Sequence, residues 1–269
     1  MLRLPAVAGQ FYPANPKELA AQVKRLTQNE RTAEKLRVRA CLVPHAGYMY
    51  SGAVAGAVFA RVFLPKKILL LGVRHYPRGE ALAILSDGAW RTPLGDVPID
   101  GALAAALRRE CPLLREDSVA HRQEHSLEVE LPFLQILAPE FSFVPVAVGT
   151  LQFEELAATG EGVARVLRQS DEEILVVTSS DMNHYEDDQT TRTKDGKAID
   201  RMLLLDTKGL YDVCRTEKIS MCGLGPAITM LRAMNLLGVT KAELLGYATS
   251  GDISGDRSAV VGYAGMVFG

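Results

Sequence analysis

The sequence predicts an α/β fold: a central, mainly parallel or mixed sheet with helices on both faces. Short aliphatic segments that suit buried strands alternate along the 269 residues with longer segments of helical pattern. The strand segments are apolar throughout, as in parallel sheets that are covered on both sides. No Gly/Ser linker, repeat or low-complexity stretch divides the chain, so we expect residues 1–269 to form a single domain.

Six segments are predicted strands, because each is a short run of mostly aliphatic residues bounded by turn residues. In chain order they are residues 39–44, 66–72, 141–149, 172–180, 241–250 and 258–268. Eight longer segments are predicted helices. In chain order they are residues 15–28, 51–63, 99–111, 126–137, 151–169, 195–206, 207–217 and 225–238.

Capping and breaking residues refine the predicted helices. Asn15 can cap the first helix and Asp100 the third, because their side chains accept hydrogen bonds from free backbone N–H groups. Pro132 predicts a kink in the fourth helix. Gly160 and Gly162 predict a break in the fifth helix.

Charge and composition exclude several classes of protein. The formal net charge is −2 and aromatic residues make up 6% of the chain, which leaves no basic surface or stacking platform for nucleic acid. The longest aliphatic runs are too short to cross a bilayer, and the first residues lack the apolar stretch of a signal peptide. The four cysteines form no C-x-x-C pair, so we expect free thiols in the reducing cytoplasm.

Polar side chains follow several predicted strands at the point where the strand ends. His45 follows the first strand, His75 the second, and Asp181 and His184 the fourth. Ligands of α/β sheets bind beyond the carboxyl ends of the strands, which share one edge when the strands are parallel. We therefore expect these three histidines to converge. A fourth, His125, lies near the start of a predicted helix.

Converging imidazoles favour a metal site, because neutral imidazole is the most common metal ligand in proteins. Two histidines and one anionic group, with open positions, form the non-haem Fe(II) arrangement. Asp181, Glu124 and Cys222 could each supply the anion. Cys222 shortly precedes a predicted helix, whose positive dipole end lowers a thiol pKa and favours the thiolate. The residues alone leave the choice open.

Other interpretations compete with the metal site. Each strand-end histidine could be a hydrogen-bonded loop residue, Asp181 a turn cap, and Cys222 a small core residue. The sequence HRQEH at 121–125 also matches the inverted zinc-protease motif H-x-x-E-H, with Glu124 as the base. That motif needs a long helix carrying both histidines, and Pro132 follows too soon for one.

Six motifs, in order along the chain, resemble those of the Memo family, and more closely its prokaryotic branch, AmmeMemoRadiSam system protein B. They are PAVAGQFYPA, PHAGYMYSG, EHSLEVELPFLQ, SSDMNHY, MCG and SGDISGDRSAVVGYAG. Any one of them alone would be a weak signal, but together they span nearly the whole chain. The sequence departs in one place: animal Memo proteins carry an arginine and a histidine soon after CG, where this chain has CGLGP.

The resemblance implies a fold similar to class III extradiol dioxygenases, such as protocatechuate 4,5-dioxygenase, which hold Fe(II) with two histidines and a glutamate. It implies His45 and His75 as metal ligands, with Cys222 in place of the glutamate. Fe(II) is the expected ion, and copper or zinc are the alternatives. His184 matches the histidine that acts as acid and base at the substrate, and Asp181 belongs to the same motif.

The resemblance also places Glu124 and His125 at the rim of the site. It makes His125 a further candidate for proton transfer, and Glu124 and Tyr48 candidates for substrate contact. His121 is not required by the family pattern, which weakens the zinc-protease interpretation. The family name implies two companion proteins, a radical-SAM enzyme and a small AMMECR-type protein.

Two functions are compatible with these residues. The first is a non-haem metal enzyme with oxidoreductase, dioxygenase-like activity on an unknown substrate. The second is a non-catalytic protein that binds a metal, senses redox state or binds a small-molecule or peptide ligand, and acts with the radical-SAM companion.

Overall fold

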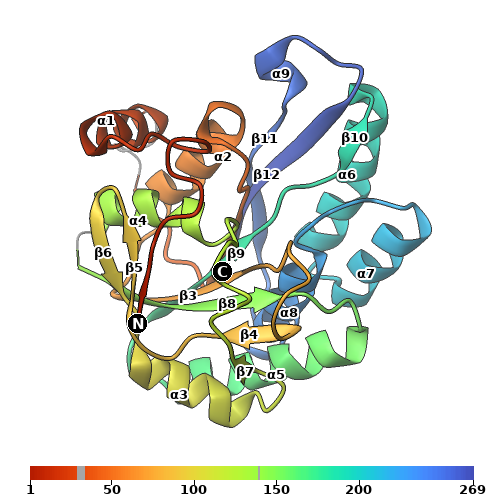
Figure 1. Ribbon diagram of the computed structural model, residues 1–269. Helices are drawn as coiled ribbons and strands as arrows, with labels where there is room; N and C mark the ends of the chain where they lie inside the picture. The colour runs from red at the N-terminus through yellow and green to blue at the C-terminus, as the bar shows by residue number, and fades with distance from the viewer. Residues whose placement is uncertain (29–33, 139) are drawn as a thin grey trace.

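The computed structural model describes residues 1–28, 34–138 and 140–269, which fold around a mixed β-sheet (Figure 1). Within these residues the strands lie in the order β10-β12-β2-β9-β3-β8-β4-β7, and β11 also pairs with β12. These strands span Ala40–Val43 (β2), Lys67–Val73 (β3), Leu82–Ile84 (β4), Arg115–Glu116 (β7), Ser142–Val148 (β8), Ile174–Ser179 (β9), His184–Glu186 (β10), Ala242–Thr249 (β11) and Val260–Phe268 (β12).

Helices cover both faces of this sheet, as the sequence predicts (Figure 1). The helices of the described residues span Pro16–Leu26 (α1), Tyr48–Arg61 (α2), Gly101–Glu110 (α3), Leu131–Leu137 (α4), Phe153–Gln169 (α5), Asp188–Leu203 (α6), Thr207–Thr216 (α7), Leu224–Leu236 (α8) and Gly251–Ser254 (α9). None of them combines the length and the apolar character that a membrane span requires.

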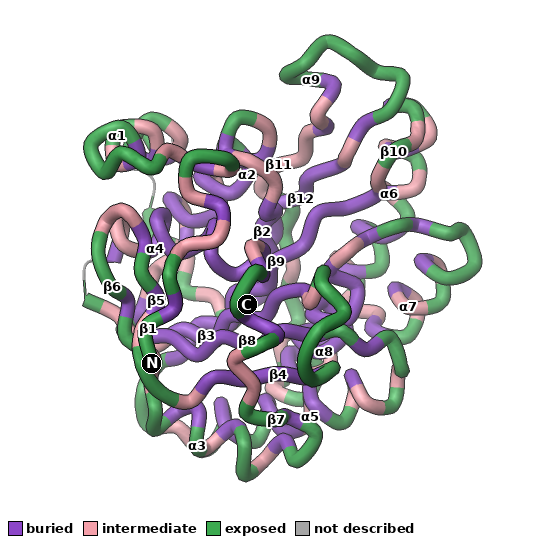
Figure 2. Tube along the Cα trace, viewed as in Figure 1, coloured by how far each residue is buried: buried purple, intermediate pink, exposed green. Residues whose placement is uncertain are grey.

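The centre of the sheet is parallel. β2 and β3 both pair in parallel with β9, and β3 pairs in parallel with β8 on its other side. These strands are apolar on both faces because both faces are covered: Leu69 and Leu71 pack on the side of α3, α5 and α8, whereas Ile68 and Leu70 pack on the side of α2 and α4. Figure 2 shows these central strands as a continuous buried layer.

A second, smaller sheet covers part of the chain that the sequence left unassigned. Its strands are β1 (Leu2–Arg3), β5 (Ala89–Thr92) and β6 (Gly95–Pro98), in the order β1-β5-β6. β5 and β6 form a short antiparallel hairpin, and the first residues of the chain add a parallel strand to its edge. β1 has only two residues, and β5 and β6 lack the aliphatic run that predicts a buried strand.

The predicted break in the fifth helix is wrong. α5 is continuous through Gly160 and Gly162. The role of these glycines is to let neighbouring backbone approach the helix closely. A Cβ on Gly160 would lie 2.5 Å from the carbonyl oxygen of Thr229 in α8. The fourth predicted helix divides at its proline: a 3₁₀ turn, Glu128–Glu130 (η1), precedes α4, and Pro132 occupies the first turn of α4, where its missing N–H is not needed.

We expect Gly160→Ala to lower the free energy of unfolding by about 1–3 kcal/mol, since α5 and α8 would have to separate. Gly196→Ala is the matched control, because Gly196 lies inside α6 with open space at its Cβ position. This substitution should stabilise the protein by up to about 1 kcal/mol. Urea unfolding of both variants measures the difference. A Gly160→Ala protein as stable as the wild type would contradict this account of the continuous helix.

Candidate metal centre

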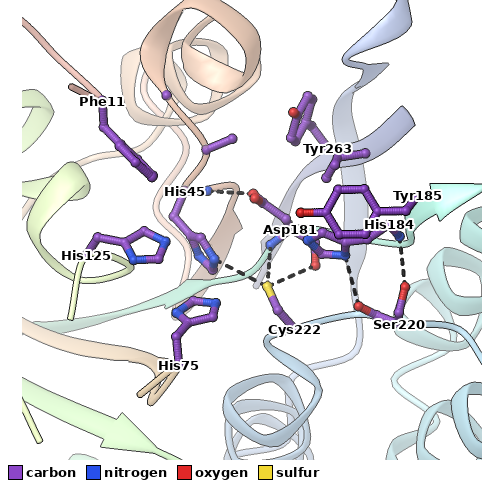
Figure 3. Close-up of a pocket in the computed structure, with 13 residues that line it drawn as sticks. Phe11, His45, His75, His125, Asp181, His184, Tyr185, Ser220, Cys222 and Tyr263 are labelled. Carbon is purple, nitrogen blue, oxygen red and sulfur yellow. Dashed lines mark hydrogen bonds between the residues drawn. The ribbon is translucent and has the colours of Figure 1, made fainter. Parts of the chain in front are cut away.

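The parallel strands bring three predicted residues to one edge of the sheet. His45 lies two residues after β2, Asp181 two residues after β9 and His75 two residues after β3. Because β9 lies between β2 and β3, Asp181 follows the strand between the two that precede the histidines. Figure 3 shows the two histidine rings facing the same space, as the strand-end positions predict.

A third imidazole joins this pair. The ligand atoms of His45, His75 and His125 all lie within 4.8 Å of one another, so these three side chains could hold one metal ion. The rings of His75 and His125 stack with their centroids 4.5 Å apart, and the ring of His45 stands nearly perpendicular to both. His125 arrives from the loop before η1, which the strand-end rule does not cover.

Cys222, the predicted third ligand, lies beside His45 and comes from a fourth segment, the turn between α7 and α8 (Figure 3). Its Sγ lies 3.2 Å from Nε2 of His45 and accepts a hydrogen bond of 3.2 Å from the backbone N–H of Asp181. A carboxylate oxygen of Asp181 in turn accepts a hydrogen bond from the backbone N–H of His45. Asp181 therefore ties together the two loops that carry His45 and Cys222.

Glu124, expected to contact the substrate, is fully buried beside two of these histidines: its Oε1 lies 2.8 Å from Nδ1 of His75 and 3.7 Å from Nδ1 of His125. Its carboxylate accepts hydrogen bonds from Nδ1 of His75 at 2.8 Å, from the backbone N–H of His75 and from that of Ser126. Burial acts to raise the pKa of Glu124, but the hydrogen bond from His75, the neighbouring imidazoles and the Ser126 N–H together outweigh it and lower this pKa to about 2. The ionised carboxylate fixes the ring so that Nε2 is the nitrogen left free.

Burial favours the neutral form of the His45 and His125 imidazoles. It lowers the pKa of His45 well below its ordinary value, and it lowers the pKa of His125 to about 4. Burial also raises the pKa of the Cys222 thiol, with a further contribution from Asp181. The expected lowering of this pKa by the helix dipole is thus wrong for the metal-free chain, because desolvation of the thiolate is the larger effect.

His184 lies across the cavity from His125 (Figure 3). Its backbone N–H donates to Oγ of Ser220, and its Nδ1 lies 3.0 Å from the carbonyl oxygen of Ser220. Nδ1 therefore carries the hydrogen, and Nε2 keeps its lone pair. The next residue, Tyr185, has a φ of 62°, a left-handed conformation that is costly for a bulky residue, and its side chain stands exposed at the rim.

These side chains surround a cavity of about 630 Å³. None of its described lining residues is a lysine or an arginine, so it has no side-chain cation for a phosphate or carboxylate group. Aromatic and aliphatic side chains form the walls, and the imidazoles and the thiol form the floor. The lining residues are Phe11, His45, Ala46, Gly47, His75, His125, Asp181, His184, Tyr185, Ser220, Cys222, Val261 and Tyr263.

The N-terminal segment forms one wall of the cavity. The ring of Phe11 packs on the ring of His125, with the centroids 4.8 Å apart. Buried Glu128 holds this segment in place: its carboxylate accepts hydrogen bonds from the Arg3 guanidinium, from two backbone N–H groups and from the Tyr12 hydroxyl. Arg3 and Glu128 form a buried ion pair at 2.6 Å.

Two residues singled out in the sequence lie elsewhere. Tyr48, expected at the substrate, begins α2, and its buried hydroxyl donates to the carbonyl oxygen of Val129 rather than lining the cavity. His121 is fully buried beside Trp90 and Arg3, outside the cluster. Residues 121–125 form turns and no helix, so the inverted zinc-protease interpretation is wrong.

Sequence reasoning missed Phe11, Ser179, Glu130, Tyr185, Ser220 and Tyr263. Ser179 lies 2.7 Å from Nδ1 of His45 and donates a hydrogen bond to Glu130. A signal for Glu130 was present, since EVE interrupts an otherwise apolar segment and acidic residues are rarely buried without a partner. The aromatic wall residues carry no local signal, because their position depends on segments distant in sequence.

Known proteins resemble the whole chain. The family model described as Memo-like protein matches residues 3–267. A MEMO1 family protein of Methanopyrus kandleri is 42% identical over 280 residues, covering 100% of this chain and 99% of the relative. A MEMO1 family protein of Aquifex aeolicus is 42% identical over 268 residues and covers 99% of both chains. The solved structure of an uncharacterized Escherichia coli K12 protein matches 86% of this chain and 100% of its own at a TM-score of 0.57 and 12% identity, which shows a shared fold alone.

We expect Glu128→Gln to lower the free energy of unfolding by about 3–5 kcal/mol, because it leaves the Arg3 guanidinium buried without its counter-charge. Glu173→Gln, which ends the exposed ion pair with Arg37, is the control and should cost less than about 1 kcal/mol. Urea unfolding measures both, and proteolysis near Phe11 reports release of the cavity wall. Equal stability losses in the two variants would refute the role given to Glu128.

Proposed function

The chain belongs to the Memo-like protein family, and from its site we propose that it binds a redox-active metal ion, with iron as the first expectation, for oxidoreductase, dioxygenase-like chemistry on a small molecule. The observation that carries the proposal is that His45, His75, His125 and Cys222 line one cavity. The three imidazoles have their ligand atoms within 4.8 Å of one another, and Cys222 lies 3.2 Å from His45. The dioxygenase-like part comes from the resemblance of the motifs, and the metal-binding part from the side chains themselves.

The side chains fit a metal ion. Nδ1 of His45 and Nδ1 of His75 each meet an oxygen atom behind the ring, at 2.7 and 2.8 Å, which leaves Nε2 of each ring as the ligand atom. Burial keeps the pKa of His45 low, so its ring does not need to lose a proton first. The thiol of Cys222 does need to lose one, and the cation itself favours the thiolate.

The donor set suits several ions. Imidazole and thiolate ligands together accept Fe(II), copper and zinc. When bound, a redox-active ion would supply the electron-transfer chemistry that amino-acid side chains lack. His125 could act as a further ligand in the cluster or hold a proton beside it, and the two roles differ in what its removal does to metal content.

The chain itself would orient the ligand and move protons. His184 faces the cavity with an unprotonated Nε2, which makes it a general base for a hydroxyl or amide of the ligand. Asp181 holds the His45 and Cys222 loops together through backbone N–H groups. The aromatic side chains, and the lack of a lysine or arginine among the described lining residues, favour a neutral small molecule or an apolar peptide side chain.

A second candidate is a non-catalytic, redox-sensing or ligand-binding protein. Among the described cysteines, Cys222 alone is partly exposed, while Cys41, Cys111 and Cys214 are buried. An accessible thiol beside a metal site can report oxidation without turnover. The radical-SAM and AMMECR-type companions suggested by the family name would then read the state of the site.

Metal content tests the proposed ligands. Purified without oxygen and supplied with Fe(II), the wild type should hold one equivalent, whereas His45→Ala and Cys222→Ala should each lose at least about tenfold in affinity. His121→Ala and Cys214→Ala are matched controls, because both residues lie outside the site. Both variants should bind the metal as the wild type does. Full iron occupancy in both ligand variants would exclude these two residues, whereas loss on His45→Ala and His125→Ala with full occupancy in Cys222→Ala would favour a three-histidine set.

Oxygen uptake separates the two candidate functions. Iron-loaded protein is mixed with a small-molecule cell extract, and uptake that depends on the extract and disappears in Cys222→Ala supports an enzyme. His184→Gln should then lower the rate by about 10²–10⁴-fold with unchanged metal content, because it removes the base and leaves the ligands. Stoichiometric metal without extract-dependent uptake favours the non-catalytic function.

A further inference from the structure

Nδ1 of His45 contacts the buried hydroxyl of Ser179, which in turn contacts the buried carboxyl of Glu130. We propose that Ser179 and Glu130 form a positioning pair that fixes the tautomer and orientation of the His45 ring, and thereby sets the metal affinity of the site. The effect on metal affinity rests on the proposed function. The tautomer of His45 does not, because it is a property of the metal-free chain.

The contacts form a continuous line from the cavity into the core. Sγ of Cys222 lies 3.2 Å from Nε2 of His45, and Nδ1 of His45 lies 2.7 Å from Oγ of Ser179. Oγ of Ser179 donates to Oε1 of Glu130 at 3.0 Å. Ser179 is the last residue of β9 and Glu130 the last residue of η1, so two different elements hold the ring.

Hydrogen counting along this line selects one tautomer. A serine hydroxyl has a single hydrogen, and that of Ser179 is directed to Glu130. With the Ser179 hydroxyl donating to Glu130, the Ser179 oxygen is free to accept from His45, and this places the hydrogen of the imidazole on Nδ1. Nε2 is left with its lone pair toward Cys222 and the cavity, as a metal ligand requires.

Glu130 acts as the acceptor of this line of hydrogen bonds. It is fully buried, its only hydrogen bond from a described residue comes from Ser179, and its Oε2 has no partner among them. Burial raises the pKa of Glu130 well above its ordinary value, and Oε1 is the atom that accepts from Ser179. The partner of His45 therefore differs from that of His75, which faces the ionised carboxylate of Glu124 directly.

The neighbouring residue supplies a control within the same strand. Thr178 is also fully buried in β9, yet its hydroxyl has no hydrogen-bond partner among the described residues. Thr178→Val removes that hydroxyl at nearly constant volume. It should leave both the His45 tautomer and the metal affinity unchanged, so it separates loss of the positioning contact from general disturbance of the strand.

The first experiment reads the tautomer without metal. Ring ¹⁵N shifts of labelled histidine, assigned by comparison with His45→Gln, should show His45 protonated on Nδ1 in the wild type and in Thr178→Val. Ser179→Ala should give a mixture of tautomers, because Nδ1 loses its acceptor. A wild-type ring protonated on Nε2, or an unchanged Nδ1–H ring in Ser179→Ala, would overturn the proposal.

The second experiment measures Zn(II) affinity by competition with a chelator. Ser179→Ala should bind about 10–100-fold more weakly than the wild type, and Thr178→Val equally well. Glu130→Gln, whose amide oxygen can still accept from Ser179, should stay within about threefold; a tenfold loss would overturn the role of Glu130 as a simple acceptor. Equal affinity of Ser179→Ala and wild type would refute the positioning pair and leave the proposed function intact, whereas a wild type that binds no metal would defeat the proposed function and leave the tautomer result standing.

Discussion

The parallel pairing of β2 and β3 on the two sides of β9 is the constraint on which the site depends. It places the carboxyl ends of three strands at one edge, so that His45, Asp181 and His75 emerge next to one another. The strands can take this arrangement because helices cover both of their apolar faces. The chemistry at the edge thus follows from the burial of aliphatic residues that take no part in it.

Buried polar groups hold the side chains and loops at this edge of the sheet in fixed positions. Glu124 fixes His75, Asp181 joins the His45 and Cys222 loops, and Glu128 holds the N-terminal wall. A carboxylate in the core is costly unless it is paired or protonated, and each of these three accepts several hydrogen bonds or an ion pair. The same contacts that satisfy the buried carboxylates fix the loops that face the cavity.

Local pattern determines the elements, because helix and strand periodicity, caps and prolines act over a few residues. The six predicted strands and the main helices are present, with their ends displaced by a few residues in several cases. Local sequence patterns mispredict a residue whose role is set by contact with a segment distant in the chain. Gly160 was predicted to break the helix, but it lies at the close contact between α5 and α8. The strands of the small sheet carry no recognisable strand pattern.

The sequence by itself determined the α/β class, the strand-end positions of His45, His75 and Asp181, and, through its motifs, the place of Cys222. Only the tertiary structure decided that His125 joins the cluster, that Tyr48 does not reach the cavity, and that Ser179 and Glu130 stand behind His45. The physical reason is that strand order and loop packing set which side chains meet. These contacts join residues far apart in the chain, and no local periodicity encodes them.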